Sequence, residues 1–191
     1  MNRLFFGLCL ALALVLTACS ATAAEASTPP PAPTPAPAVT ATPEPEPEYT
    51  GAYNPLTGMP IAEQWANSRP IAVMLNNLKA ALPQHGVSQA DIIYEVLAEG
   101  GITRMLGVFQ TVEEAGDIGS VRSSRTYYLE LALGHDAIYL HAGGSPDAYD
   151  KIKAWSVTAL DCVNGPYEGS LYWRDRDRIK SAGYEHSVFT S

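Results

Sequence analysis

Short hydrophobic runs separated by polar turns extend from residue 51 to residue 191, a pattern typical of strands and helices packed around one core. Gly100 and Gly101 separate two of the longer runs, which predicts an antiparallel hairpin. The strand-like runs occupy residues 71–77, 91–99, 102–110, 136–142 and 157–163, with shorter runs that end at Arg122 and begin at Ser170.

Helical patterns lie between the later strands. Residues 124–134 place apolar side chains at spacings of three and four, which predicts a helix. Ser145 is a good N-cap and is followed by Pro146, so a second helix is expected from there to about Trp155. The alternation predicts an α/β fold: a mixed sheet with parallel βαβ units and an antiparallel hairpin, flanked by helices.

A different composition marks residues 21–50, which are rich in proline, alanine, threonine and glutamate. Val39 is the only large apolar residue before Tyr49, so this segment lacks the side chains to bury a core. Proline-rich chains favour extended polyproline II, and about 30 residues at about 3.1 Å each would reach on the order of 90 Å. We therefore expect a disordered, semi-rigid linker; a proline-motif ligand is the alternative.

The amino terminus has the pattern of an export signal. Arg3 precedes an apolar run over residues 4–16, which is shorter than the roughly 20 apolar residues that span a bilayer. The sequence Leu-Thr-Ala-Cys ending at Cys19 resembles the bacterial lipobox, which implies cleavage before Cys19, lipid on its sulfur, and an extracytoplasmic protein anchored to the bacterial cell membrane. The alternative is an ordinary signal peptide. The expected organisation is a signal peptide at 1–18, a lipidated cysteine and linker at 19–50, and a domain at 51–191.

Cysteine and charge content narrow the choice of partners. Cys162 would be the one cysteine left in the domain, where we expect a buried thiol and no internal disulfide. Residues 51–191 carry 16 acidic and 11 basic side chains, a net charge of −5, so no nucleic-acid partner is expected. No nucleotide-binding motif occurs and the histidines lack metal-ligand spacing, so neither cofactor nor metal is expected. These histidines are His85, His135, His141 and His186.

The loops after two predicted strands form the best candidate for a binding site. If the strands that end at Arg122 and His141 are parallel neighbours, these loops lie at one sheet edge, where ligands bind in such folds. Two helix starts, guanidinium groups and a Gly-Gly turn would meet there, and all favour an anion. The alternative is structural: paired arginines, a helix cap and a buried histidine. The predicted anion pocket consists of Arg122, Ser123, Arg125, His141, Gly144 and Ser145.

A second group of charged residues surrounds the predicted hairpin. Glu95 and Glu99 would share one face of a regular strand, and paired carboxylates perform acid–base chemistry in glycosidases. With Arg104 opposite them, a charge network is the other interpretation, and we favour it. The alternating charges at residues 174–178 predict a solvated, self-compensating strand or loop, and a ligand site is the alternative.

Six stretches of the chain resemble the YerB-like lipoproteins, a bacterial family with a domain of unknown function. They are NPLTGMP, RPIAVMLNN, ADIIYEVLAEGGITRMLGVFQ, IGSVRSSR, DAIYLHAGGSP and YWRDRDR, in the family's order, over residues 52–191. The resemblance implies the same signal, lipobox and linker, and a smaller second domain that this chain, as a fragment, lacks. At Ser187 the chain departs from the asparagine that members commonly carry. Because the family has no established activity, the resemblance implies architecture and location but no mechanism.

Two functions are compatible with these patterns. One is a non-enzymatic, membrane-anchored lipoprotein that binds an anionic ligand or a partner in the cell envelope. The other is an enzyme, a phosphotransferase or hydrolase, acting on a cell-wall or polyprenyl-phosphate substrate. The order Asp91, hairpin, Arg104, Arg122 and Arg125 resembles the LytR–CpsA–Psr phosphotransferases, which hold a polyprenyl pyrophosphate with arginines. We favour binding, because no nucleophile, base and orienting group can be named together.

Overall fold

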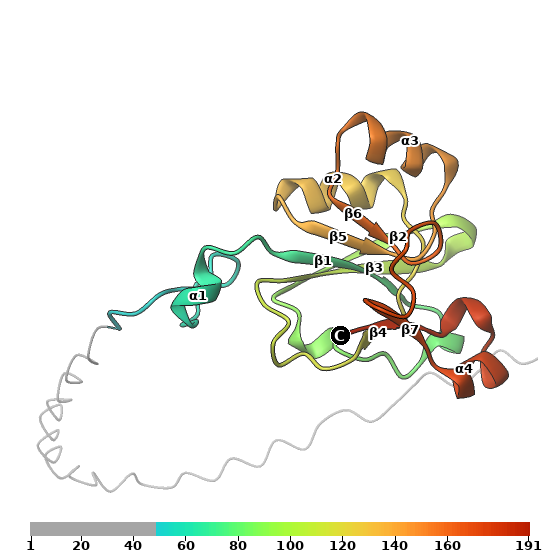
Figure 1. Ribbon diagram of the computed structural model, residues 1–191, viewed down its shortest axis with the longest axis horizontal. Helices are drawn as coiled ribbons and strands as arrows, with labels where there is room; N and C mark the ends of the chain where they lie inside the picture. The colour runs from blue at the N-terminus through green and yellow to red at the C-terminus, as the bar shows by residue number, and fades with distance from the viewer. Residues whose placement is uncertain (1–48) are drawn as a thin grey trace, which may run out of the picture. The chain divides into compact units, whose positions relative to one another are not determined.

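The computed structural model describes residues 49–191, and a five-stranded mixed sheet forms its centre (Figure 1). The strand order is β2-β3-β1-β5-β6. The hairpin pairs β2 with β3 and β1 is antiparallel to β3, whereas β1 with β5 and β5 with β6 are parallel. The predicted mixed α/β sheet with its hairpin is confirmed. The strands are β1 (Ile71–Asn76), β2 (Ile92–Leu97), β3 (Thr103–Phe109), β5 (Ile138–His141) and β6 (Ala159–Asp161).

A second, three-stranded antiparallel sheet has the order β4-β8-β7. Its strands are β4 (Ile118–Gly119), β7 (Tyr172–Arg174) and β8 (Val188–Thr190). The short strand expected to end at Arg122 is β4. It ends at Gly119 and pairs with β8, so the expectation that it is a parallel neighbour of β5 is wrong. The physical reason is that its partner β8 lies about 70 residues later in the sequence, so no local pattern predicts the pairing.

Two helices of nine residues each, α2 (Thr126–Gly134) and α3 (Pro146–Ala154), pack on the same face of the main sheet (Figure 1). The predicted cap of α3 is confirmed, because the Ser145 hydroxyl accepts a hydrogen bond from the Ala148 N–H at 3.2 Å. The polar loop expected within residues 174–178 is partly the helix α4 (Arg176–Ser181). Asp175 caps it by accepting bonds from its first N–H groups, which corrects that expectation.

The remaining helical segments are single turns. They are α1 (Glu63–Ala66) and the 3₁₀ turns η1 (Lys79–Ala81), η2 (Val87–Gln89), η3 (Glu99–Gly101) and η4 (Tyr184–His186). None of the helices in residues 49–191 combines the length and the apolar character needed to cross a membrane. The expected signal peptide, Cys19 and linker lie outside the described residues, except Tyr49 and Thr50 at the linker's end.

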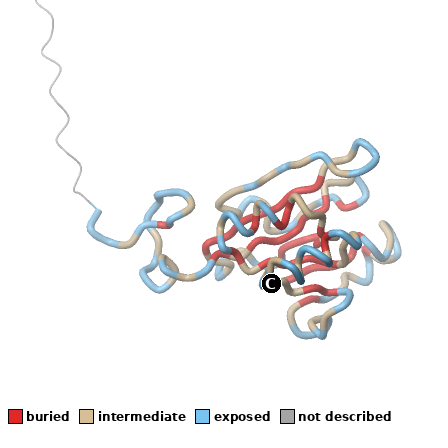
Figure 2. The backbone as a smooth tube through the Cα atoms, turned by 90° about the horizontal axis from the view of Figure 1, so that it is seen from above, coloured by how far each residue is buried: buried red, intermediate tan, exposed pale blue. Residues whose placement is uncertain are grey.

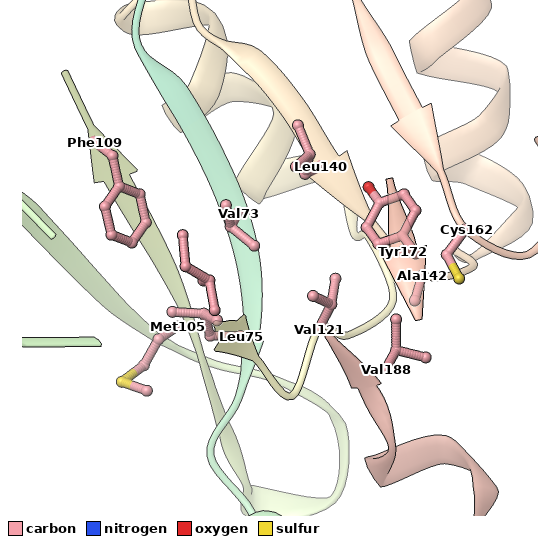
Figure 3. Packing of buried hydrophobic residues seen from close by; sticks show 11 residues of the cluster. Val73, Leu75, Met105, Phe109, Val121, Leu140, Ala142, Cys162, Tyr172 and Val188 are labelled. Atoms are coloured by element: carbon pink, nitrogen blue, oxygen red, sulfur yellow. The ribbon is translucent and has the colours of Figure 1, made fainter. Parts of the chain in front are cut away.

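The alternation of side chains along the strands produces one apolar layer on each face of the main sheet. Along the backbone, the buried residues concentrate in the central strands (Figure 2). On β1, Ala72 and Met74 face the helices, while Val73 and Leu75 face the small sheet (Figure 3). Cys162 is buried in the second layer as expected, and burial raises the pKa of its thiol to about 11. Both faces of the main sheet are therefore covered, and the open surface of interest is its edge.

Candidate functional site

A pocket of about 380 Å³ lies where the chain leaves the carboxyl ends of β5 and β6. This is the edge of the parallel strands at which ligands bind in open α/β sheets. The pocket is lined by residues 121–123, 142–144 and 163–164, together with Tyr149, Arg174, Tyr184, Glu185 and Val188. Of the predicted anion pocket, Arg122, Ser123 and Gly144 line it.

The loops after β4 and β5 meet although β4 belongs to the other sheet. Ser124 and Gly144 form a parallel bridge, in which the Ser124 N–H donates to the Gly143 carbonyl at 2.9 Å and the Ser145 N–H donates to the Ser124 carbonyl at 3.2 Å. Two residues earlier in each loop, the Ala142 N–H donates to the Arg122 carbonyl at 3.0 Å. Backbone bonds thus bring the predicted loops together without the predicted strand pairing.

Arg122 carries the least compensated charge of this edge. One Nη of its guanidinium donates to the Glu185 carbonyl at 3.3 Å, and it forms no ion pair within residues 49–191. Burial lowers the pKa of Arg122, and the nearby Arg125 lowers it further, while Glu185 opposes both effects. The side chain remains charged at neutral pH, because the pKa of an arginine guanidinium starts far above neutral pH.

Arg125 differs from Arg122, because the structure directs it into an ion pair and not into the pocket. Its Nε lies 2.5 Å from Glu99 Oε1 and one Nη lies 3.0 Å from Glu99 Oε2, a bidentate geometry. Arg104 approaches the same carboxylate at 3.5 Å and donates to the Ser123 carbonyl at 2.9 Å. We name Glu99, Arg104 and Arg125 the Glu99 cluster. The hydrogen bond from Arg125 is the largest influence on Glu99 and holds the pKa of that carboxyl below its ordinary value.

His141 and Ser145, also predicted for the pocket, do not line it. The His141 ring is fully buried, and its Nδ1 lies 2.8 Å from the Gly143 carbonyl, so Nδ1 carries the proton. Its Nε2 has no hydrogen-bond partner among the described residues. Burial lowers the pKa of His141, so the ring is neutral at pH 7. Ser145 acts as the N-cap of α3. Both residues thus stabilise the loop of residues 142–145 without lining the pocket.

Asp161, which the sequence analysis missed, organises the wall of the pocket. Its Oδ1 accepts the N–H groups of Gly143 at 2.8 Å and Val163 at 2.9 Å, and its Oδ2 accepts the Tyr149 hydroxyl at 2.7 Å and the Asn164 amide at 3.1 Å. Burial alone would raise the pKa of Asp161, but these donors hold it below its ordinary value. The available signal was a carboxylate placed at the end of a hydrophobic strand run.

The opposite wall comes from the last part of the chain; Tyr184 was missed, and Arg174 lies in the segment for which a ligand site was the alternative. Arg174 stacks on the Tyr184 ring at 3.7 Å from its centroid and donates to the Tyr184 carbonyl at 3.0 Å. Its Nε is 3.0 Å from Glu168 Oε1, so its charge is balanced. No local pattern could place these residues opposite Arg122, because the segment folds back through the small sheet.

Glu95 belongs to a separate polar group. One of its carboxylate oxygens accepts the Asn77 amide at 2.9 Å and the Thr103 hydroxyl at 2.6 Å. Glu99 lies beyond the end of β2, in η3, and pairs with arginines instead. The two carboxylates thus have different partners, and Glu99 forms the charge network that we favoured over a catalytic pair.

Two backbone N–H groups complete the pocket. Those of Ser123 and Gly144, both in lining residues, donate to no acceptor within residues 49–191. The preceding Gly143 has φ of +76°, a conformation that favours glycine and that lets the chain turn here. No group of three or more metal-ligating side chains occurs in the part of the chain that the structure describes. The arrangement therefore offers one guanidinium and two N–H donors to a ligand.

Fold and pocket together define an α/β domain with an open pocket at the carboxyl edge of its parallel strands. The chain belongs to the family described as "Protein of unknown function (DUF3048) N-terminal domain", whose profile matches residues 56–191.

Comparisons with a protein sequence and a crystal structure from Bacillus subtilis agree with this assignment. "Putative lipoprotein YerB" of strain 168 is 44% identical over 121 residues, which are 63% of this chain and 35% of that protein. The crystal structure of YerB protein matches with a TM-score of 0.66 and 37% identity, covering 73% of this chain and 46% of the crystallised chain. The resemblance to the YerB-like family is confirmed, and this chain spans less than half the length of either relative.

Proposed function

We propose that this protein is a membrane-anchored, extracytoplasmic lipoprotein whose folded domain binds an anionic ligand. Support for the anchor comes from the lipobox-like sequence ending at Cys19 and from a relative named as a lipoprotein. A bacterial lipid anchor with more than one acyl chain would hold the protein stably at the membrane. The linker of residues 21–50 would then separate the binding domain from the surface.

The observation that carries anion binding is the charge of Arg122 in an open pocket without a carboxylate partner. Arg125 lies close enough to lower the pKa of both Arg122 and Arg104, so three guanidinium groups share this edge. Glu99 balances the charge of its own cluster, whereas Arg122 donates to a backbone carbonyl and feels the Glu185 carboxylate without forming an ion pair with it. An anion in the pocket would relieve this excess of positive charge.

The neighbouring donors favour the same kind of ligand. The N–H groups of Ser123 and Gly144 add two neutral donors beside the guanidinium. Hydrogen bonds to a charged group are worth roughly 1.5–3 kcal/mol each. The net charge of the whole chain is −8, so a positive pocket contrasts with its surroundings and would concentrate anions there.

The test is a binding titration of the full chain in a phosphate-free maltoside detergent, with inorganic phosphate as probe and phosphorus NMR line broadening as readout. Arg122→Gln should weaken phosphate binding at least tenfold. Arg176→Gln is the matched control, because it removes an exposed guanidinium outside the pocket, and it should leave the affinity unchanged. An unchanged affinity in Arg122→Gln, or no binding by the wild type, would contradict the proposal.

The anchor has its own test. Cys19→Ala should abolish lipidation and release the protein from the membrane fraction, measured by fractionation and by the mass of the intact protein. A variant that stays with the membranes and keeps the lipid mass would show that the anchor assignment is wrong. Cys162→Ala is the control, since that thiol is buried in the domain.

A further inference from the structure

We infer that the ligand of this pocket is an anion attached to an apolar group, such as an aryl or alkyl phosphate monoester. This inference rests on the proposed function and goes beyond it by assigning the chemistry of the ligand's organic part. The lining of the pocket distinguishes such a ligand from a free inorganic anion and from a sugar phosphate.

The floor of the pocket is apolar. Val121, Ala142 and Val188 lie together in one hydrophobic layer at the end of the main sheet (Figure 3). The Val121 N–H donates to the Val188 carbonyl at 2.7 Å, so this backbone donor is not available to a ligand. A hydroxyl-rich group placed on this floor would lose its bonds to water and find few new ones, which costs free energy.

The rim of the pocket is also apolar, and it is open to solvent. Val163 is 55% exposed and Tyr184 is 57% exposed, although both are large hydrophobic residues. The stacking of Tyr184 on Arg174 fixes the orientation of its ring, so little conformational entropy is lost when a ligand covers it. Covering these two side chains is favourable only for an apolar partner.

The polar groups of the pocket are few, and they fit a single anionic head. Arg122 and the N–H groups of Ser123 and Gly144 provide the positive side. Glu185 also lines the pocket, and its backbone hydrogen bond lowers the pKa of its carboxyl, so it stays ionised at neutral pH. A second anionic group on the ligand would meet this carboxylate, whereas an uncharged apolar substituent would not. One anionic group and one apolar group therefore match the lining.

The experiment compares three phosphates on the full chain in maltoside detergent by phosphorus NMR titration: inorganic phosphate, phenyl phosphate and glucose 1-phosphate. Phenyl phosphate should bind at least fivefold more tightly than inorganic phosphate, and glucose 1-phosphate should show no such gain. Octyl phosphate, used below its micelle concentration, tests whether an alkyl group replaces the aryl group.

Matched variants separate the rim from the anion site. Val163→Ser and Tyr184→Ser should each reduce the ratio of the affinity for phenyl phosphate to the affinity for inorganic phosphate. Leu97→Ser is the control, because Leu97 is 65% exposed on β2 and does not line the pocket. Both rim residues are exposed, so these substitutions leave the buried core intact.

The outcomes distinguish this inference from the proposed function. Equal affinities for phenyl phosphate and inorganic phosphate, or an equal gain with glucose 1-phosphate, would overturn the apolar assignment and leave anion binding standing. Failure of all probes to bind would overturn both. Release of inorganic phosphate from phenyl phosphate would show that the pocket is a hydrolytic site, and the binding-only function would be wrong while the ligand class would stand.

Discussion

Arg122 and Arg125 lie three positions apart in one loop, yet they occupy opposite kinds of environment. Arg122 opens into a pocket and donates to a single carbonyl, whereas Arg125 is fixed by a bidentate pair in the Glu99 cluster. The same residue type is therefore available to a ligand at one position and already neutralised at the other. The difference is set by η3, which places a carboxylate beside Arg125 and not beside Arg122.

The comparison shows that composition alone does not identify a ligand-binding arginine. Exposed ion pairs contribute little to stability, with a typical value of about 0–1 kcal/mol. A guanidinium without an ion pair in a pocket is informative because its charge has been partly desolvated with no carboxylate in direct contact. Breaking each environment separately tests whether the two arginines differ as the structure indicates.

The largest effect is expected from Asp161→Ala, which removes the acceptor behind the pocket wall. Four donors, including the Gly143 N–H and the Tyr149 hydroxyl, would lose their partner. The free energy of unfolding should fall by about 2–4 kcal/mol, measured by urea denaturation. Phosphate binding should weaken as well, because the loop that presents Gly144 would lose its support.

Glu99→Gln is the contrasting variant for that measurement. Its carboxylate is more than half exposed, so the loss of stability should be no more than about 1 kcal/mol. A loss equal to that of Asp161→Ala would contradict the distinction between a structural carboxylate and a surface ion pair.

Gly143→Ala should have the second largest effect. A Cβ at this position would meet no atom closer than 3.6 Å, so the cost comes from the backbone φ of +76°. A left-handed conformation costs a residue with a side chain about 1–2 kcal/mol. Thermal unfolding should report a loss of this size, and Gly58→Ala, which has φ of +73° far from the pocket, should show a similar loss with unchanged phosphate affinity.

The pH dependence of stability gives a third, smaller effect. Burial lowers the pKa of His141 below its ordinary 6.5, so between the two values the unfolded chain binds more protons than the folded protein. Stability should therefore fall as the pH falls below about 6.5, by at most about 1.4 kcal/mol per pH unit from this residue. Urea denaturation should be measured from about pH 7.5 to about pH 5.5, which is about one unit on either side of the ordinary histidine pKa. The free energy of unfolding should depend less steeply on pH in His141→Gln than in the wild type.

A residual slope should remain in His141→Gln. Burial also lowers the pKa of His186, whose Nδ1 lies 2.7 Å from the Asn76 amide. The double variant His141→Gln, His186→Gln should show the smallest slope. An identical slope in wild type and double variant would mean that neither histidine is held neutral by the fold.

The smallest effect is expected from Arg125→Gln on ligand binding. Because Glu99 already neutralises Arg125, phosphate affinity should change by less than about threefold, which is about 0.6 kcal/mol. Arg122→Gln provides the comparison, with a loss of at least tenfold. Equal losses in the two variants would mean that both arginines reach the ligand.

Local patterns predicted those parts of the fold that depend on neighbouring residues. The hairpin follows from two strand runs around Gly100 and Gly101, and α3 follows from the Ser145-Pro146 start. The strand β4 has only two residues, and its partner β8 comes roughly 70 residues later, so no periodicity reveals the pairing. The short length of β4 and the distance in sequence to its partner both limited the prediction.

Charge alternation misled the interpretation of residues 174–178 for a similar reason. A period of two suggests a solvated strand, but Arg178 turns inward and donates to the carbonyls of Ala81 and Pro83. Its guanidinium also lies 4.9 Å from the Phe189 ring centroid. These acceptors come from a distant loop, so only the folded chain shows that this arginine is structural.

The candidate site was predicted in part for the same physical reasons. Arg122, Ser123 and Gly144 follow from loops beside strand ends, which sequence patterns locate. Asp161 and Tyr184 required knowledge of which loops face one another. The separation of Arg122 from Arg125 required the position of Glu99, which the hairpin sets.

The position of β8 at the centre of the small sheet has a consequence for biogenesis. Residues 188–190 are all buried and pair with both β4 and β7, so the small sheet is incomplete until they have been synthesised. At about 5–20 residues per second, the roughly 70 residues after β4 take about 4–14 s to be synthesised. Until residues 188–190 are available, β4 and β7 lack the strand that joins them, so the apolar layer between the two sheets stays incompletely covered.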